Sequence, residues 1–290
     1  MIDSLLKALR SLEGLSVGDA FGELFFHLSP YATSPSDLPQ TVWPWTDDTH
    51  MALSIVEVLQ KLGHIDQDAL AQAFARRYQA EPYRGYGGGT IRLLRRVAAG
   101  EDWRNISPIL FGSGSYGNGA AMRAAPIGGY FCDDLQRVAQ EAQLSAEVTH
   151  AHPEGQAGAI AVAVAAAIAA NIPHPRGREF LQSVLKFVPE GVTKNRIRLA
   201  LDIPPDALLQ AIYTLGTGTE VSAQDTVPFC LWNAAYHLED FESALWQTAK
   251  GPGDCDTTCA IVGGIVSLSA QNIPAAWLRH REQLPLISKI

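Results

Sequence analysis

Two short clusters of aspartate and threonine stand far apart in the sequence, and each directly precedes an apolar stretch. The first is residues 46–49 (TDDT) and the second is residues 253–258 (GDCDTT). Carboxylates and hydroxyls offer only oxygen ligands, which suit hard cations such as Mg²⁺, Ca²⁺ or Mn²⁺ better than zinc. If the fold brings the clusters together, four carboxylates share one pocket, and like charges that close need cations or protons to coexist. The two clusters therefore predict a binuclear metal site.

Each cluster alone also fits a second interpretation, the start of a helix. Asp and Thr are strong N-cap residues, and negative charge at a helix N-terminus is favoured by about 0.3–1 kcal/mol. A cap needs one acid, however, whereas each cluster supplies two. Together with the glycine motifs described below, this surplus favours the ligand interpretation.

The composition excludes several classes of protein. With 290 residues, 47% of them hydrophobic, the chain can bury a sizeable core. A net charge of −8 argues against general nucleic-acid binding. The longest apolar run, residues 157–170, is too short for a membrane span and is expected to be a buried helix. We expect a cytoplasmic protein, because no secretory signal is evident and the four cysteines form no zinc pattern.

Apolar residues recur at three- and four-residue steps along almost the whole chain, which is the pattern of amphipathic helices. Alternating strand patterns are nearly absent, so we expect one all-α domain over residues 1–290, with 172–222 as a candidate peripheral insertion. Besides helices around Leu5–Leu12 and Leu53–Leu62, helices are expected at 66–79, 88–98, 133–148, 155–171, 177–187, 205–214, 225–237, 240–249, 257–270 and 273–280.

Glycines mark three further segments. In residues 14–23, Gly14, Gly18 and Gly22 recur every four residues, which on a helix permits close packing, while Asp19 would be a buried acid in need of a partner. Residues 84–89 (RGYGGG) are expected to form a loop before a helix. Residues 111–123 (FGSGSYGNGAAMR) alternate glycine with polar residues before an expected Ala-rich helix.

The third segment offers backbone N–H groups that suit a phosphate, and a structural turn is its alternative interpretation. Phe111 and Tyr116 could supply flat surfaces for a base or ribose. His150 ends a predicted helix, where it either caps or packs locally or faces the same pocket.

In this order, the segments GDAFG, TDDTHMA, GSYGNGAAMR, THAHPEG and GDCDTT resemble the ADP-ribosylglycohydrolase family. The resemblance runs from about Gly14 to Ile265, and the glycine-rich segments are most similar to the branch that includes the poly(ADP-ribose) and serine-ADP-ribose hydrolase of animals. It implies a single-domain orthogonal helical bundle, two Mg²⁺ (or Mn²⁺) ions, and ADP-ribose or an ADP-ribosylated protein or polymer as the substrate. We expect a monomer that binds no membrane.

The resemblance also implies site residues. The implied metal ligands are Thr46, Asp47, Asp48, Asp254, Asp256 and Thr257. The implied substrate contacts are Asp19, Phe111, the glycine loop (Gly114, Ser115, Tyr116, Gly117 and Asn118) and His150. The glycine loop would hold the diphosphate and distal ribose, Phe111 and Tyr116 would flank the adenosine end, and His150 would lie near the pyrophosphate. Asp254 or Asp256 would orient the attacking water.

One departure from the family pattern bears on activity. Family hydrolases usually carry a glutamate seven residues after the aspartate of the GDA motif, and here that position is Phe26. Glu23 lies on the same predicted helical face, about one turn earlier, and is the candidate replacement for proton transfer. Three hypotheses follow. The first is a metal-dependent ADP-ribosyl hydrolase, and the second is a non-catalytic protein that binds ADP-ribose or metal. The third is an ordinary all-α protein with capped helices.

Overall fold

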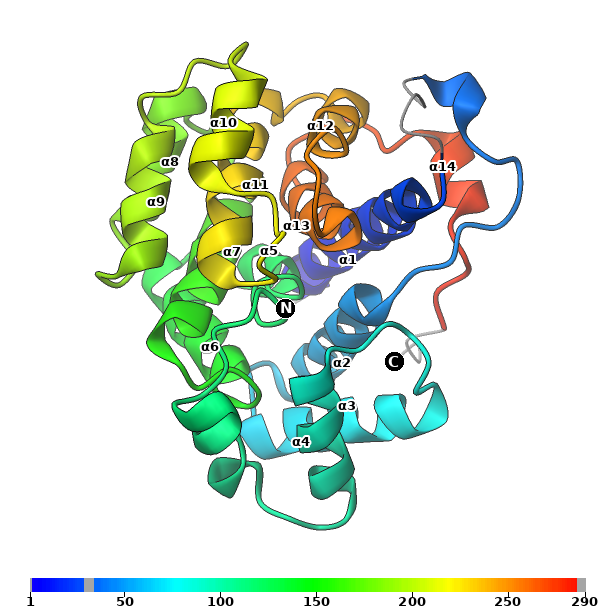
Figure 1. Ribbon diagram of the computed structural model, residues 1–290, viewed down its shortest axis with the longest axis vertical. Coiled ribbons are helices and arrows are strands. Elements are labelled where there is room, and N and C mark those ends of the chain that lie inside the picture. The colour runs from blue at the N-terminus through cyan, green and yellow to red at the C-terminus, as the bar shows by residue number, and fades with distance from the viewer. Residues whose placement is uncertain (1, 29–33, 286–290) are drawn as a thin grey trace.

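The computed structural model describes residues 2–28 and 34–285, which form a bundle of crossing helices (Figure 1). The expected all-α architecture is confirmed: within these ranges no β-strand occurs, and two isolated bridges join Trp43 to Arg281 and Gly117 to Ser222. The α-helices are α1 Ile2–Glu23, α2 Asp47–Leu62, α3 Gln67–Ala80, α4 Gly88–Ala98, α5 Ala125–Tyr130, α6 Leu135–Glu147, α7 Pro153–Ala170, α8 Gly177–Leu185, α9 Val192–Ala200, α10 Leu208–Leu215, α11 Ala223–His237, α12 Phe241–Thr248, α13 Cys255–Val266 and α14 Ala275–His280. Short 3₁₀ helices are η1 Leu24–Phe26, η2 Pro35–Asp37, η3 Trp103–Asn105 and η4 Ser107–Gly112.

Helices α1 and α13 pack closely at the centre of the bundle (Figure 1). The glycines of α1 make this possible, because a Cβ at Gly18 would collide with the carbonyl oxygen of Cys259 and one at Gly22 with that of Cys255. The four-residue glycine spacing thus correctly predicted a close helix contact. Its consequence is that the N-terminus of α13, with the second acid cluster, lies against the C-terminal half of α1.

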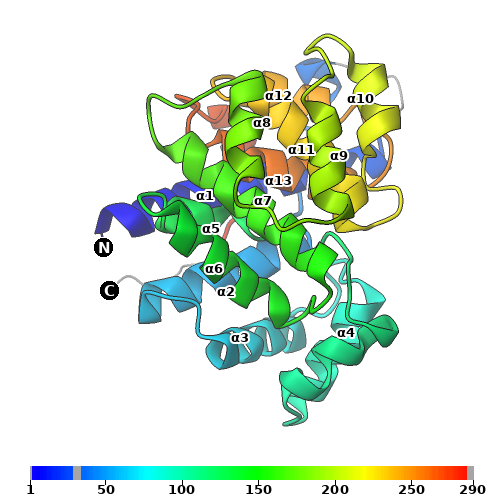
Figure 2. The same cartoon turned by 90° about the vertical axis from the view of Figure 1, so that its left-hand side faces the viewer.

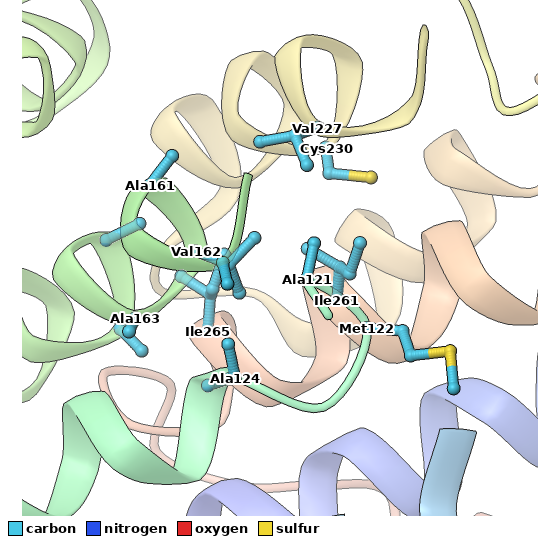
Figure 3. Packing of buried hydrophobic residues seen from close by; sticks show 14 of the residues in the cluster. Ala121, Met122, Ala124, Ala161, Val162, Ala163, Val227, Cys230, Ile261 and Ile265 are labelled. Carbon is cyan, nitrogen blue, oxygen red and sulfur yellow. The ribbon is translucent and has the colours of Figure 1, made fainter. Parts of the chain in front are cut away.

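Small apolar side chains fill the space between α7, α11 and α13. Figure 3 shows Val162 of α7, Val227 of α11 and Ile265 of α13 directed into one cluster. Ala121 and Ala124, both fully buried, belong to the same cluster. Because this segment directly follows the glycine loop, its packing fixes the point at which the loop leaves the core.

Helix α7 is the one helix among the described residues that is long and apolar enough to span a membrane by length and composition. In the structure 78% of that 18-residue span is buried, as for the core helix of a globular domain. The expectation of a buried helix at 157–170 is therefore met.

Three segments differ from the sequence-based expectation. Helix α5 contains Gly128 and Gly129, which disfavour helix formation, whereas Pro126 lies in the first turn, where proline is tolerated. It forms because its glycines allow contact with α7 and α1: a Cβ at Gly128 would strike the carbonyl oxygen of Ala163. Helix α9 was also missed, because in its largely polar sequence only Thr193, Ile197 and Ala200 are buried. The Ala-rich helix expected after the glycine loop is wrong, since residues 120–123 form turns and α5 begins at Ala125.

Helices α8, α9 and α10 form an outer layer that contacts α7 and α11 (Figures 1 and 2). They account for most of the candidate insertion at 172–222. Residues 216–222 do not share this peripheral position, because the Thr217 carbonyl accepts a hydrogen bond of 3.2 Å from Asp254 N and Val221 reaches the site described below.

The segment before α2 is held by a strap near the C-terminal end of the described chain. Trp43 N donates to His280 O at 2.7 Å, and Glu282 N donates to Trp43 O at 2.8 Å. The Glu282 carboxylate pairs with Arg84, whose guanidinium stacks over the Trp45 ring at 3.6 Å. This strap fixes the chain immediately before the first acid cluster.

Candidate active site

The first acid cluster forms the N-terminus of α2, as the cap interpretation requires. Thr46 is the N-cap residue, and its Oγ1 accepts a hydrogen bond of 3.4 Å from Asp48 N. Asp47 and Asp48 occupy the first turn, where the helix dipole favours negative charge. Because Thr46 already serves as the cap, the two aspartates remain available for another role.

Asp19 anchors this helix terminus from α1. Its fully buried carboxylate accepts hydrogen bonds from the backbone N–H groups and the hydroxyls of Thr46 and Thr49, with the shortest, from Thr49 Oγ1, at 2.5 Å. Burial raises the pKa of Asp19 to about 6 in spite of these bonds. Asp19 does not line the cavity described next, and its hydrogen bonds hold Thr46 and the start of α2 in place.

The second acid cluster forms the N-terminus of α13. Asp254 occupies the N-cap position, yet its side chain makes no capping hydrogen bond. Its Oδ2 instead accepts a bond of 2.6 Å from Asn118 Nδ2 in the glycine loop. Asn118, predicted to contact the diphosphate, thus contacts the acid cluster directly, and Thr226 Oγ1 also lies 3.1 Å from its amide nitrogen.

The two clusters converge on one cavity of about 450 Å³. Thr257 Oγ1 lies 3.5 Å from Asp48 Oδ2, and this contact joins the two helix N-termini. Of the predicted site residues, the cavity is lined by Asp47, Asp48, Phe111, Ser115, Tyr116, Gly117, Asn118, His150, Asp254, Asp256 and Thr257. Four predicted residues do not line it, namely Asp19, Glu23, Thr46 and Gly114.

Proximity and burial make the carboxyl groups of Asp47, Asp48 and Asp256 difficult to ionise. Burial, then Asp19 and Asp254, raise the pKa of Asp47 to about 8. Burial, then Asp256, raises the pKa of Asp48 well above its usual range, and burial, then Asp254, does the same for Asp256. Four acids that share one cavity therefore need protons or bound cations.

The donors present fit a hard divalent cation. Asp48 Oδ1 and Asp256 Oδ1 are buried, yet neither has a hydrogen-bond partner, which is unusual for a carboxylate oxygen. With the hydroxyls of Thr46 and Thr257, the set contains oxygen only. Within residues 2–28 and 34–285, no three His, Cys, Asp or Glu side chains are arranged to hold one ion, so carboxylate rotation would have to complete a site.

A glycine-rich part of the cavity wall lies beside Asp47, because a Cβ on Gly85 would come within 3.4 Å of Asp47 Oδ1. The predicted loop of residues 84–89 contributes Gly85 and Gly87, and α4 begins at Gly88 with its first residues facing the cavity. A helix N-terminus with exposed N–H groups suits an anion. The sequence signal is the run of three glycines at residues 87–89, for which the sequence alone predicts a loop and no binding role.

Aromatic side chains stand at the cavity rim. Phe111 and Tyr116 are 65% and 46% exposed, as flat surfaces for a ligand would be. Phe111 adopts φ of 54°, a left-handed conformation that is costly for a bulky residue, and its ring occupies space that a Cβ at Gly89 would fill. Val221, also left-handed with φ of 51°, lines the cavity too, and no sequence motif indicated it.

Glu23 and Phe26 are the two residues concerned by the departure from the family pattern. Helix α1 ends at Glu23, so the continuous helical face that was expected to carry both residues is interrupted by η1. The Glu23 carboxylate lies 3.5 Å from His27 Nε2, and the Phe26 side chain is half exposed. Neither residue lines the cavity.

Comparison with known proteins agrees with this fold and shows the family. The ADP-ribosylglycohydrolase family model matches residues 2–289, and the chain belongs to that family. It is 38% identical over 269 residues to ADP-ribosylhydrolase ARH3 of Gallus gallus, covering 80% of this chain and 72% of that protein. Identity to the Homo sapiens ARH3 is 35% over 292 residues, covering 88% and 79%.

Two further matches have lower sequence identity. An ADP-ribosylarginine hydrolase of Serratia proteamaculans is 26% identical over 312 residues, covering 99% of this chain and 78% of that protein. A solved structure described as an ADP-ribosylglycohydrolase-related protein complex aligns with a TM-score of 0.60 at 24% identity, covering 97% of this chain and 94% of that one. This structural likeness confirms the fold.

Proposed function

We propose that this protein is a divalent-metal-dependent hydrolase that removes ADP-ribose from a modified acceptor by cleaving the bond at the anomeric carbon of the ribose. The observation that carries the proposal is that four aspartates and several glycines line one cavity. A serine-type O-linkage or poly(ADP-ribose) is the favoured substrate, because the ARH3 relatives are more similar to this chain than the arginine hydrolase is.

The residues that would hold two Mg²⁺ ions, with Mn²⁺ as the alternative, are Thr46, Asp47, Asp48, Asp254, Asp256 and Thr257. Bound ions would supply Lewis acidity and compensate the charge of the carboxylates. The orphaned oxygens of Asp48 and Asp256 support this assignment, because ligation would satisfy both.

The protein's own groups account for the remaining chemistry. Asp254 or Asp256 would accept the proton of the attacking water, and Asn118 fixes the orientation of Asp254 through its bond of 2.6 Å. Positive charge that develops on the ribose ring would be stabilised by the surrounding carboxylates. The glycine-rich wall and the N-terminus of α4 offer N–H groups for the diphosphate.

The second candidate function is a non-catalytic ADP-ribose or metal-binding protein. Two observations favour it: Phe26 stands where the family usually has a glutamate, and Glu23 does not line the cavity. Under this hypothesis the cavity would bind ADP-ribose but would lack a group to transfer a proton to the leaving acceptor.

One assay separates the two functions. Release of ADP-ribose would be measured from serine-linked, arginine-linked and polymeric substrates, with Mg²⁺ and with chelator. Mg²⁺-dependent release, fastest from the serine-linked or polymeric substrate, supports the hydrolase. Tight ADP-ribose binding without release from any substrate supports the binding protein.

We also propose that the protein acts as a cytoplasmic monomer; its four free cysteines fit a reducing compartment.

A further inference from the structure

Arg123 is a buried cation close to the cavity. Its side chain is fully buried, yet within the described residues it forms no ion pair with a carboxylate. Its Nη1 donates to Gly119 O, and its Nη2 donates to Ser145 O at 3.0 Å and to Thr149 Oγ1 at 2.9 Å. The guanidinium also lies 4.7 Å from the centre of the Phe74 ring. One side chain thus ties the end of the glycine-rich segment to the residue next to His150.

The hydrogen bonds of Arg123 fix the direction of the next one. A guanidinium can only donate, so Thr149 Oγ1 acts as the acceptor and keeps its own proton free. His150 Nδ1 lies 2.7 Å from that oxygen. If the imidazole donated to Thr149 instead, the hydroxyl proton of Thr149 would lose the one acceptor that the described residues offer it. Thr149 is only 1% exposed, so this proton would be buried without a hydrogen bond. The favoured order is therefore Arg123 to Thr149 to His150.

This order selects one tautomer of His150. A neutral imidazole that accepts at Nδ1 carries its proton on Nε2. His150 lines the cavity, and its Nε2 would lie 3.3 Å from a Cβ placed on Gly117. Burial and then Arg123 lower the pKa of His150 to about 3, so the ring is neutral at physiological pH. Its Nε2 makes no hydrogen bond to any part of the described chain, and this leaves the donor for a ligand.

We infer that Arg123 and Thr149 are positioning residues that hold His150 as the neutral Nε2–H tautomer and direct that donor into the cavity toward a phosphate oxygen of the ligand. The identity of the ligand rests on the proposed function, whereas the tautomer does not. An uncharged, fixed donor binds a diphosphate without having to reorganise when the ligand arrives.

Imidazole ¹⁵N spectra of the free protein test the tautomer directly. The His150 signal is assigned by its loss in His150→Gln, and wild type is expected to show protonated Nε2 and unprotonated Nδ1. Thr149→Ser keeps the hydroxyl and should keep this pattern. Thr149→Val has a similar shape but no hydroxyl, so both tautomers should appear. A protonated Nδ1 in wild type, or an unchanged tautomer in Thr149→Val, would overturn the inference. The wild-type spectrum decides even if Thr149→Val does not fold.

Calorimetry with ADP-ribose on single and double variants tests whether the hydrogen bond from Thr149 to His150 affects ligand binding. Thr149→Val should weaken binding about tenfold, the typical effect of one misdirected hydrogen bond, and Thr149→Ser should restore it. In a His150→Gln background the same Thr149→Val change should have no further effect. Equal weakening in both backgrounds would show that Thr149 acts independently of His150 and would overturn the inference. If wild type does not bind ADP-ribose, the proposed function fails, and the tautomer spectra still decide the relay.

Discussion

Thr257 Oγ1 lies 3.5 Å from Asp48 Oδ2, although 209 positions separate the two residues in the chain. The contact exists because α1 brings two helix N-termini together: Asp19 anchors the start of α2, and the glycines of α1 admit the start of α13. The fold thus places the acidic residues at helix N-termini, where the helix dipole favours negative charge. It also brings them so close together that their mutual repulsion disfavours ionisation.

The first prediction concerns pH and Mg²⁺. The pKa of Asp47 rises from an ordinary 3.8 to about 8 on folding, so its stabilising contribution is complete below the unfolded value and is lost as pH rises through about 8. Metal-free protein should therefore lose stability between pH ~6 and pH ~8. Mg²⁺ binds the ionised carboxylates, so the gain in melting temperature on adding Mg²⁺ to chelator-treated protein should increase over the same range. Differential scanning fluorimetry at several pH values measures both trends.

Two variants control this experiment. Asp256→Asn removes one proposed ligand while keeping its shape, and the melting temperature should then respond little to Mg²⁺. Asp206→Asn changes an exposed aspartate that lies outside the cavity, and should respond as wild type does. A melting temperature of wild type that ignores both chelator and Mg²⁺ at every pH would refute the metal centre.

The sequence predicted more of the site than of its supports. The acid clusters and the glycine loop were recognisable from their residue types as candidate metal and phosphate contacts, whereas the family resemblance was needed to favour a binding role for the loop and for His150. Val221 was not recognisable, since it has no chemical signature and reaches the cavity only through the turn made by residues 216–222. Arg123 lies within the segment GSYGNGAAMR, but its proposed role depends on burial and on three acceptors, one at Gly119 and two in residues 145–149. Pairings of that kind are set by tertiary structure.

The second prediction tests the glycine loop as a diphosphate site. Ser115→Asp places a negative charge on the cavity wall and should weaken ADP-ribose binding at least tenfold through like-charge repulsion. The matched control is Ser113→Asp, two residues away on an exposed side chain that does not line the cavity. Calorimetry should give the control near wild-type affinity. Equal affinity of Ser115→Asp and wild type would make the loop purely structural.

The third prediction concerns His50, which is buried beside the first acid cluster, with its Nδ1 2.8 Å from the Tyr86 hydroxyl. Burial, then Arg77, lowers its pKa from 6.5 to about 4. At pH values between the folded pKa and the unfolded pKa of His50, the unfolded chain binds a proton that the folded protein does not. Lowering the pH through this range therefore decreases the free energy of unfolding, by at most about 1.4 kcal/mol per pH unit. His50→Gln removes this sensitivity. In urea titrations with Mg²⁺, the stability of wild type relative to His50→Gln should fall from pH ~7 to pH ~5. A constant difference would contradict the assignment.

The last prediction concerns Glu23. Sequence reasoning made Glu23 the candidate for proton transfer, because it shares a predicted face with Phe26, whereas the structure pairs its carboxylate with His27 and leaves it outside the cavity. We therefore expect Glu23→Gln to hydrolyse the favoured substrate at close to the wild-type rate. Asp256→Asn should lose activity by a factor of about 10² or more, the usual effect of removing a group that acts on the reacting atoms. Loss of turnover in Glu23→Gln with unchanged ADP-ribose binding would instead show that Glu23 transfers the proton. In that case a movement of the chain around residues 24–28 would have to bring its carboxylate to the ribose. Phe26→Glu tests the remaining alternative: activity gained only in this variant would show that the natural chain binds ADP-ribose without cleaving its linkage.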